Sequence, residues 1–288
     1  MTLACPIPFQ KMTATGNDFL LVGLDESEEQ RLWPQWFGSM ARSEVAKKLC
    51  DRHFGVGADG LLILTLGENT DFTWDFYNSD GSTAEMCGNA ARCAHLWAEN
   101  RRQTNRPFRF STRAGVIETA RSSFRDKWID VSMPNSQILQ PQLSAKNFGI
   151  NWTTDENWSF VNAGVPHLVI PLDHSPGDRE LELARKLRGH SYFGAAGTNI
   201  TFIQPKNSPL SFSTIERGVE NFTLSCGTGA VASALWMKIY KKINHIDLVT
   251  RGGELAVTFV DSKATLRGPA AWIADVYIHN HESGAFKP

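Results

Sequence analysis

The sequence lacks the features that mark several large classes of protein. Its 29 lysine and arginine residues nearly balance its 30 aspartates and glutamates, so the net charge is −1 and no basic surface for nucleic acid is indicated. No apolar run is long enough to span a membrane, and residues 1–9 lack the basic segment of a secretory signal. We therefore expect a cytoplasmic protein that binds neither nucleic acid nor a membrane.

A disulfide framework is also missing. The chain has five cysteines, an odd number for 288 residues, and they are expected to remain thiols in a reducing compartment: Cys5, Cys50, Cys87, Cys93 and Cys226. Cys5 and Cys50 are interpreted as small buried residues, and so is Cys93, which lies six positions after Cys87 and off its helical face. A zinc site at Cys87, Cys93 and His95 is disfavoured because the cysteine spacing is too wide and no second ligand pair follows.

What the chain does contain is an internal repeat. Cys87-Gly88-Asn89 and Cys226-Gly227-Thr228 each precede an alanine-rich run that predicts a helix, and they lie 139 positions apart. The same offset carries Trp97 onto Trp236, Gly60 onto Asn199 and Asn78 onto Arg217. A looser match, offset by 148, joins residues 16–20 to residues 164–168. One register that fits so many positions indicates a duplicated unit.

Both halves show the same order of predicted elements. Residues 7–23 and 159–170 each predict strand, turn and strand, residues 42–53 and 179–188 predict helices, and residues 90–100 and 230–240 predict the helices after the cysteines. Residues 25–40 are interpreted as a polar surface excursion and residues 134–157 as a linker. Many strands with one central helix per half predict an α+β protein with two pseudo-symmetric domains, over residues 1–132 and 133–272.

The chemistry of the repeated motif depends on its position before a helix. A thiol at a helix N-terminus meets the positive end of the helix dipole, which favours the thiolate, and the N–H groups there can hold a carboxylate. Two such sites could remove a proton from one face of an amino-acid α-carbon and return one to the other face. The Gly227-Thr228-Gly229 turn could instead be a phosphate nest, but the Lys-Ser/Thr ending of a P-loop is missing.

Several strings resemble the diaminopimelate epimerase family: residues 16–19, 55–60, 78–82, 85–93, 216–219 and 226–230. The similarity spans nearly the whole chain in the family's order. It implies an α+β fold from an internal duplication, in which each domain is a curved, mostly antiparallel sheet around a central helix. The last strand, residues 273–288, would return to the first domain. It also implies a cofactor-independent epimerase, without metal, that interconverts LL- and meso-diaminopimelate in lysine and peptidoglycan precursor synthesis.

The resemblance assigns roles residue by residue. Cys87 and Cys226 are the expected acid/base pair, and Glu216 meets the reacting amino group. The N–H groups of Gly88, Asn89, Gly227 and Thr228 hold the reacting carboxylate. The other substrate-binding residues are Asn17, Asn78, Asn199 and Arg217, and His167 supports the thiols. The partner is a small amino acid, and a homodimer is the candidate assembly.

The sequence departs from the family's pattern at Val165, Gly60 and Phe222, which leaves the distal group of the substrate open. One alternative is a racemase of the same superfamily acting on proline, hydroxyproline or histidine. A second is a thiol redox protein, although the chain lacks a Cys-x-x-Cys motif. A third is a non-catalytic amino-acid binder, for which two equivalent thiols would have no purpose.

Overall fold

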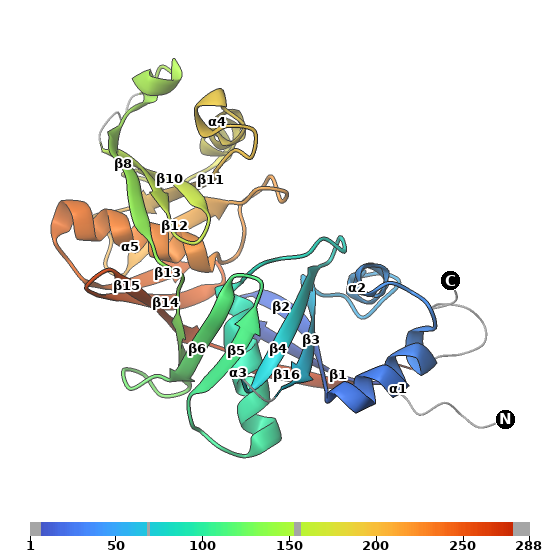
Figure 1. The fold of residues 1–288 in the computed structure, drawn as a ribbon. Coiled ribbons are helices and arrows are strands. Elements are labelled where there is room, and N and C mark those ends of the chain that lie inside the picture. The colour runs from blue at the N-terminus through green and yellow to red at the C-terminus, as the bar shows by residue number, and fades with distance from the viewer. Residues whose placement is uncertain (1–6, 68–69, 153–156, 279–288) are drawn as a thin grey trace. The chain divides into compact units, whose positions relative to one another are not determined.

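The computed structural model describes residues 7–67, 70–152 and 157–278. The described chain divides into two compact units: unit 1 is formed by residues up to 129 together with those from 270 onward, and unit 2 is formed by residues 130–269. Each unit is a mostly antiparallel sheet with a helix of 15 residues on its inner face (Figure 1), α3 (Gly88–Arg102) in unit 1 and α5 (Gly227–Lys241) in unit 2. The α+β class predicted from the sequence is confirmed.

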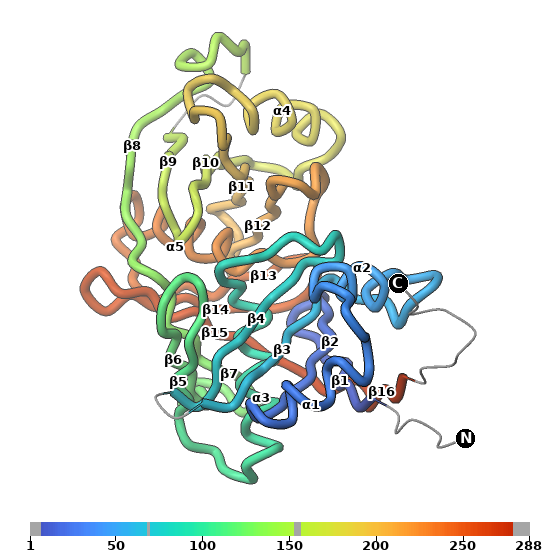
Figure 2. The backbone as a smooth tube through the Cα atoms, turned by 45° about the vertical axis from the view of Figure 1, so that its right-hand side comes forward, coloured from blue at the N-terminus to red at the C-terminus, as the bar shows by residue number. Residues whose placement is uncertain are grey.

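The sheet of unit 1 runs in the order β16-β1-β2-β3-β4-β5-β6. Its strands are β1 (Ile7–Ala14), β2 (Asn17–Leu24), β3 (Gly60–Leu66), β4 (Phe72–Asn78), β5 (Phe108–Thr112), β6 (Gly115–Arg121) and β16 (Ala271–Ile278). β16 pairs with β1, so the end of the described chain lies beside its beginning (Figure 2). β7 (Trp128–Ser132) contains the boundary between the units.

The sheet of unit 2 runs in the order β15-β14-β13-β12-β11-β10-β9-β8. Its strands are β8 (Gln137–Leu143), β9 (Trp158–Asn162), β10 (Pro166–Pro171), β11 (Asn199–Gln204), β12 (Leu210–Ile215), β13 (His245–Thr250), β14 (Gly253–Val260) and β15 (Lys263–Pro269). Both units have parallel pairs at the same places, β2–β3 and β4–β5 in unit 1 and β10–β11 and β12–β13 in unit 2.

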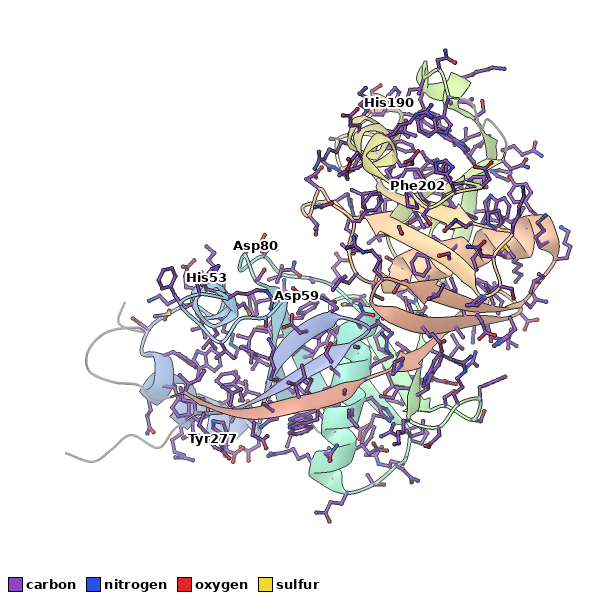
Figure 3. The ribbon with its side chains drawn as sticks, turned by 180° about the vertical axis from the view of Figure 1, so that it is seen from behind. His53, Asp59, Asp80, His190, Phe202 and Tyr277 are labelled. Carbon is purple, nitrogen blue, oxygen red and sulfur yellow. The ribbon has the colours of Figure 1, made fainter. Side chains whose placement is uncertain are left out.

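The central strands are buried on both faces, which explains their continuous apolar sequences. In unit 1, α1 (Glu26–Phe37) and α2 (Arg42–Cys50) cover the outer face of the sheet, while α3 covers the inner face. In unit 2, α4 (Asp178–Arg188) covers the outer face and packs on the buried Phe202 of β11 (Figure 3). Short 3₁₀ turns cover Ala145–Phe148 and Ser191–Phe193. None of the helices in the described ranges is both long and apolar enough to cross a membrane.

The register of the sheets supports the internal duplication and corrects one of its details. Phe19 pairs with Gly60 in unit 1 and His167 pairs with Asn199 in unit 2, which agrees with the offsets of 148 and 139. The helices also agree, because α3 and α5 start and end 139 positions apart. The following strands do not agree with the offset of 139, because the pairing of β4 with β5 matches that of β12 with β13 at an offset of 138. Asn78 therefore corresponds to Glu216, and the sequence-based match of Asn78 with Arg217 is wrong by one residue.

Two segments interpreted as irregular contain regular structure. Within residues 25–40, Glu26–Phe37 form α1, whose N-terminus is fixed by a capping box between Asp25 and Glu28. Trp36 and Phe37 on this helix are buried, and Pro34 lies inside it. Within the expected linker 134–157, β8 pairs with β9. The polar composition of both segments hid these elements, because helix α1 buries little more than its C-terminal end and β8 is exposed along most of its length.

A glycine of β2 sets how closely α3 approaches the sheet. A Cβ atom built on Gly23 would lie 1.9 Å from Cζ2 of Trp97, so only glycine leaves room for this indole. We expect Gly23→Ala to destabilise the protein by about 1–3 kcal/mol through overpacking, measured by urea unfolding. Gly189→Ala is the control, since nothing lies within 4 Å of its Cβ position. Equal midpoints for the two variants would contradict this packing.

Candidate active site

The two repeated cysteines occupy the same position in the two units. Cys87 is the N-cap of α3, with φ −143° and ψ 121°, and Cys226 is the N-cap of α5, with φ −131° and ψ 115°. In each helix the carbonyl of the cysteine accepts the first helical bond, from Ala91 and Ala230 respectively. The N–H groups of the residues between them project from the positive end of the helix. Each thiol therefore sits where both a thiolate and a bound carboxylate are favoured.

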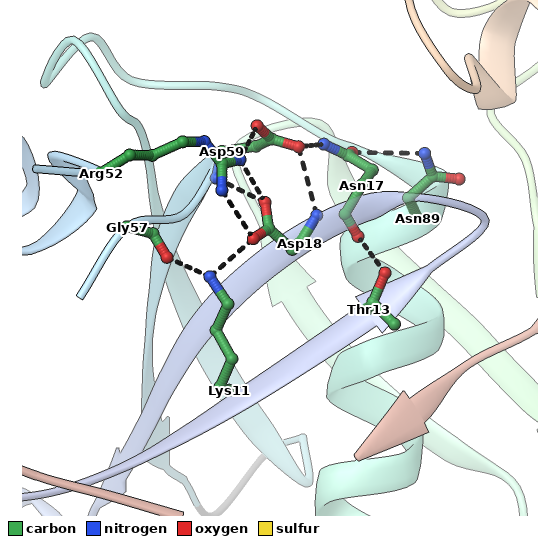
Figure 4. Close-up of polar contacts among 8 residues, drawn as sticks. All are labelled: Lys11, Thr13, Asn17, Asp18, Arg52, Gly57, Asp59 and Asn89. Atoms are coloured by element: carbon green, nitrogen blue, oxygen red, sulfur yellow. Dashed lines mark hydrogen bonds and ion pairs between the residues drawn. The ribbon is translucent and has the colours of Figure 1, made fainter. Parts of the chain in front are cut away.

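In unit 1, the side-chain amide of Asn17 lies against Cys87. The Cys87 Sγ donates to Asn17 Oδ1 at 3.9 Å, and Asn89 Nδ2 donates to the same oxygen at 3.2 Å. The other end of the Asn17 amide donates from Nδ2 to Asp59 Oδ2 at 2.5 Å (Figure 4). A two-residue hairpin turn, Thr15-Gly16, positions Asn17 at the start of β2, and both turn residues have positive φ as a type I′ turn requires.

Behind these amides lies a fully buried arginine on α3. Arg92 is 0% exposed, and burial lowers the pKa of its guanidinium to about 10. Its Nη2 donates to Asn89 Oδ1 at 2.8 Å and to Thr15 Oγ1 at 2.9 Å. Arg92 thus joins the hairpin turn before β2 to the first turn of α3.

A network of charges supports Asn17 from the other side (Figure 4). Arg52 contacts Asp18 Oδ1 and Asp59 Oδ1, each at 2.8 Å, and Lys11 contacts Asp18 Oδ2 at 2.6 Å. Burial tends to raise the pKa of Asp18, but the hydrogen bonds and charges of Arg52 and Lys11 outweigh it and lower the pKa to about 2. The carboxylate of Asp18 is therefore ionised throughout the physiological pH range.

In unit 2, Cys226 is surrounded by hydroxyl and N–H groups. The N–H of Gly229 donates to Cys226 Sγ at 3.3 Å, and Thr228 Oγ1 lies 3.4 Å from the same sulfur. A Cβ atom on Gly229 would lie 2.3 Å from Thr214 Oγ1, so a side chain at this position would displace the first turn of α5. Glycine here lets the helix start close to β12.

His167 connects Thr228 to the sheet. Its Nε2 lies 2.9 Å from Thr228 Oγ1, and its Nδ1 lies 2.9 Å from Thr201 Oγ1. Thr201 continues the chain to Thr214 Oγ1 at 3.1 Å. His167 is 0% exposed, and burial, followed by the charge of Arg217, lowers its pKa to about 3. The neutral imidazole of His167 therefore lies against Thr228, whose hydroxyl contacts Cys226.

The remaining predicted residues of unit 2 adjoin His167. Asn199 Nδ2 lies 3.4 Å from His167 Nε2, and Asn199 Oδ1 accepts from the backbone N–H of Arg217 at 2.9 Å. The Arg217 guanidinium donates to the carbonyl of Ala196 at 3.3 Å. Glu216 immediately precedes Arg217 at the end of β12, and both are part-buried.

The structure thus gathers most of the predicted residues into one cluster in each unit. Asn17, Gly88 and Asn89 lie with Cys87; Gly227, Thr228, His167 and Asn199 lie with Cys226, and Arg217 adjoins them. Asn78 lies apart from these contacts: its amide donates to Ser82 Oγ at 3.0 Å, within its own turn. That turn is nevertheless fastened to the Asp59 segment, since Ser79 N donates to the Asp59 carbonyl at 2.9 Å. Figure 3 shows Asp59 and Asp80 at the same side of unit 1.

Sequence reasoning missed the residues that support the cysteines. The sequence assigns no role to Arg92 or Asp59, although both lie in strings that resemble the family, and none to Thr201 or Thr214. The available signal for the threonines was their position among apolar residues of β11 and β12. Buried hydroxyls in such strands need partners, which here include His167.

The other cysteines behave as expected where they are described. Cys50 and Cys93 are buried, and burial raises the pKa of the Cys50 thiol to about 12 and that of Cys93 further still. Cys5 lies outside the described residues. Within the described ranges, no group of three or more His, Cys, Asp and Glu side chains could hold a metal ion.

The buried His167 predicts a loss of stability in acid. Its folded pKa, about 3, is below the ordinary value of 6.5, so the unfolded chain takes up the proton first. The contribution of His167 is complete above pH 6.5 and is lost as the pH falls towards 3, by about 1.4 kcal/mol per pH unit. We expect His167→Gln to flatten the dependence of unfolding free energy on pH between 6 and 4 by that amount, with the exposed His53→Gln as the control. Parallel curves for parent and His167→Gln would contradict it.

Comparison with known proteins identifies the family. The family model described as diaminopimelate epimerase matches residues 9–139 and 159–273. The chain is 36% identical over 253 residues to a diaminopimelate epimerase of Aquifex aeolicus, and the aligned region covers 86% of this chain and 88% of the relative. It is 37% identical over 237 residues to that of Helicobacter pylori, covering 81% of each.

Solved structures share the fold at low identity. A hydroxyproline epimerase from Agrobacterium vitis matches with a TM-score of 0.68 and 13% identity, covering 97% of this chain and 94% of that one. A phenazine biosynthesis protein of the PhzF family from Bacillus anthracis matches with a TM-score of 0.69 and 13% identity, covering 95% and 99%. With its paired helix-capping cysteines and these sequence matches over most of its length, the chain belongs to the diaminopimelate epimerase family of isomerases.

Proposed function

We propose that this epimerase interconverts LL- and meso-diaminopimelate by a two-base transfer of the α-proton, with Cys87 and Cys226 as the two bases. It would act in the cytoplasm without a cofactor and serve lysine and peptidoglycan precursor synthesis. The names of the relatives support the substrate. The placement of one cysteine at the N-cap of the central helix of each unit supports the mechanism.

Inversion at a carbon needs a base on one face and an acid on the other. In this scheme one sulfur, as thiolate, takes the α-proton, and the other, as thiol, delivers its own proton to the opposite face. The roles exchange in the reverse direction, which is why two groups of the same kind suit a reversible reaction. The nearly identical backbone conformations of Cys87 and Cys226 support such equivalence.

The reacting carboxylate gains charge as the α-carbon loses its proton. The N–H groups of Gly88 and Asn89 and those of Gly227 and Thr228 are proposed to bind it, because they project from helix N-termini. Glu216 is proposed to receive the α-amino group. Asn17, Asn78, Asn199 and Arg217 would orient the substrate, with Arg217 pairing with the distal carboxylate.

His167 is proposed to act through Thr228. A neutral imidazole can exchange hydrogen bonds with the Thr228 hydroxyl without adding charge beside Cys226. The hydroxyl can then donate to the sulfur when it is a thiolate and accept when it is a thiol. This arrangement serves both protonation states of Cys226.

Two of the sequence departures have structural explanations. A Cβ atom at Gly60 would lie 2.6 Å from Phe76 Cε2 and 2.8 Å from the Tyr77 carbonyl, so a larger residue would not fit between these neighbours. Phe222 packs against the core of unit 2, with its ring 6.4 Å from that of Phe202. Neither residue is a partner of Cys87 or Cys226 in the contacts described above. Assays of diaminopimelate beside proline, hydroxyproline and histidine would distinguish the proposed substrate from those of related racemases.

Replacing either sulfur tests the mechanism. We expect Cys87→Ala and Cys226→Ala each to lower epimerisation by roughly 10²–10⁴-fold, because inversion needs both proton-transfer groups. In deuterated water, the parent protein should place deuterium in the product long before it appears in unreacted substrate. Cys93→Ala is the matched control, as a buried cysteine on the same helix as Cys87. Near-native epimerisation by either active-site variant would rule out the two-thiol scheme, as would simultaneous labelling of substrate and product.

Replacing Arg217 tests the substrate. Lysine keeps the charge but loses the planar fork that binds a carboxylate through two hydrogen bonds. We expect Arg217→Lys to lower kcat/KM for diaminopimelate roughly 10- to 100-fold, whereas Arg251→Lys, at an exposed turn, should leave it unchanged. Normal turnover by Arg217→Lys would show that the distal carboxylate is held elsewhere.

A further inference from the structure

A directed chain of hydrogen bonds crosses the Cys87 cluster. Arg92 Nη2 donates to Asn89 Oδ1 at 2.8 Å, Asn89 Nδ2 donates to Asn17 Oδ1 at 3.2 Å, and Asn17 Nδ2 donates to Asp59 Oδ2 at 2.5 Å. A guanidinium can only donate, and an ionised carboxylate can only accept. The two ends therefore determine which way each amide between them points.

The direction of this hydrogen-bond chain determines which group of the Asn17 amide faces Cys87. An asparagine amide can present either an oxygen or an NH₂ group, and its orientation follows from the surrounding hydrogen bonds. Because Nδ2 of Asn17 is committed to Asp59, its oxygen faces Cys87, with Sγ and Oδ1 3.9 Å apart. The thiol therefore meets a hydrogen-bond acceptor.

The charge network fixes the Asp59 end. Arg52 Nη2 contacts Asp59 Oδ1 at 2.8 Å, while Asp59 Oδ2 accepts from Asn17 Nδ2 and, at 3.2 Å, from the backbone N–H of Asp18. Each carboxylate oxygen thus has its own partners (Figure 4). The oxygen that faces Asn17 is held by groups on β2 and cannot rotate away without losing both bonds.

We propose that Arg92 and Asp59 are positioning residues that turn the Asn17 carbonyl towards Cys87 and thereby make Cys87 the resting acid of the two thiols. The proposal rests on the two-thiol function proposed above. An acceptor stabilises S–H relative to thiolate, whereas a donor stabilises the thiolate. Cys226 receives a donor, the Gly229 N–H at 3.3 Å, so the two sulfurs have different preferred protonation states.

The repeat supplies an independent contrast. With the offsets that join the two units, Asn17 corresponds to Val165, Arg92 to Val231 and Asp59 to Thr198. None of these three residues can reproduce the directed chain of amides. The orienting device is therefore specific to the Cys87 unit, although the helix and its cysteine are repeated.

Nearby charges could also shift the pH midpoint of Cys87 reactivity. The effect of the charged and titratable groups around Cys87 must therefore be distinguished from the effect of the Asn17 amide. The groups shown near Cys87 are Arg92 and Cys93 on α3, and Asp18 and Asp59 with their partners Arg52 and Lys11, while Glu85 precedes Cys87 by two positions in the sequence. Asp18 and Asp59 share Arg52, but only Asp59 contacts the Asn17 side chain in the bonds above. These two aspartates are a matched pair for the test.

The test measures how fast Cys87 reacts with iodoacetamide as a function of pH, in the full-length reduced protein without substrate. Trypsin cuts after Arg92, which places Cys87 and Cys93 on different peptides for mass spectrometry. Asp59→Asn lets the Asn17 amide turn and present its NH₂ group to Cys87. The pH midpoint of Cys87 alkylation should then move about one pH unit lower, which corresponds to alkylation up to roughly tenfold faster below the midpoint. Cys226, read from its own peptide in the same samples, should keep its profile.

Three further variants make the result decisive. Asp59→Glu keeps the acceptor and should retain the parent profile, and Asp18→Asn removes the same charge and should move the midpoint less than Asp59→Asn. If Asp59→Asn does not fold, as judged by thermal unfolding, Asn17→Ala removes the acceptor directly and should move the midpoint in the same direction. An unmoved midpoint, or equal shifts for Asp18→Asn and Asp59→Asn, would overturn the proposal. Because no substrate is used, this outcome is independent of whether diaminopimelate is epimerised.

Discussion

The start of each central helix is the constraint on which both clusters depend. α3 and α5 must begin at a cysteine for its sulfur to lie at the positive end of the helix, and the sheet determines where that beginning lies. Gly23 sets the approach of α3 through Trp97, and Gly229 sets the approach of α5 through Thr214. Gly23, in a strand, thus leaves room for a side chain of α3, whereas Gly229, in the first turn of α5, lets that helix lie close to Thr214.

Around this shared framework the two units have diverged. The Cys87 thiol contacts the Asn17 amide, which is anchored to a charged residue, whereas the Cys226 sulfur contacts the Thr228 hydroxyl, which is anchored to a neutral histidine. Phe19 occupies the position in the sheet that His167 occupies in unit 2, as the matching strand pairs show. Duplication therefore conserved the backbone that places each sulfur and left the supporting side chains to vary.

Much of this arrangement was predictable because it depends on local pattern. The alanine-rich runs after Cys87 and Cys226 predicted both helices, and the spacing of the repeat predicted their equivalence. The α1 helix was not predicted, since Pro34 and a polar surface masked its capping box. The one-residue shift between β4 and β12 was also hidden, because it becomes visible only when strands pair. The roles of Arg92 and Asp59 depend on contacts between residues 42 or more positions apart, here Arg92 with Thr15 and Asp59 with Asn17, and sequence periodicity carries no information on such contacts.

The pairing of β16 with β1 has a consequence for synthesis on the ribosome. Unit 2 is one continuous stretch, residues 130–269, whereas unit 1 needs residues from both sides of it. The edge of β1 that pairs with β16 therefore remains unpaired until the last strand has been synthesised. Unit 2 can complete its own sheet earlier, so the order of translation and the order of domain completion are reversed.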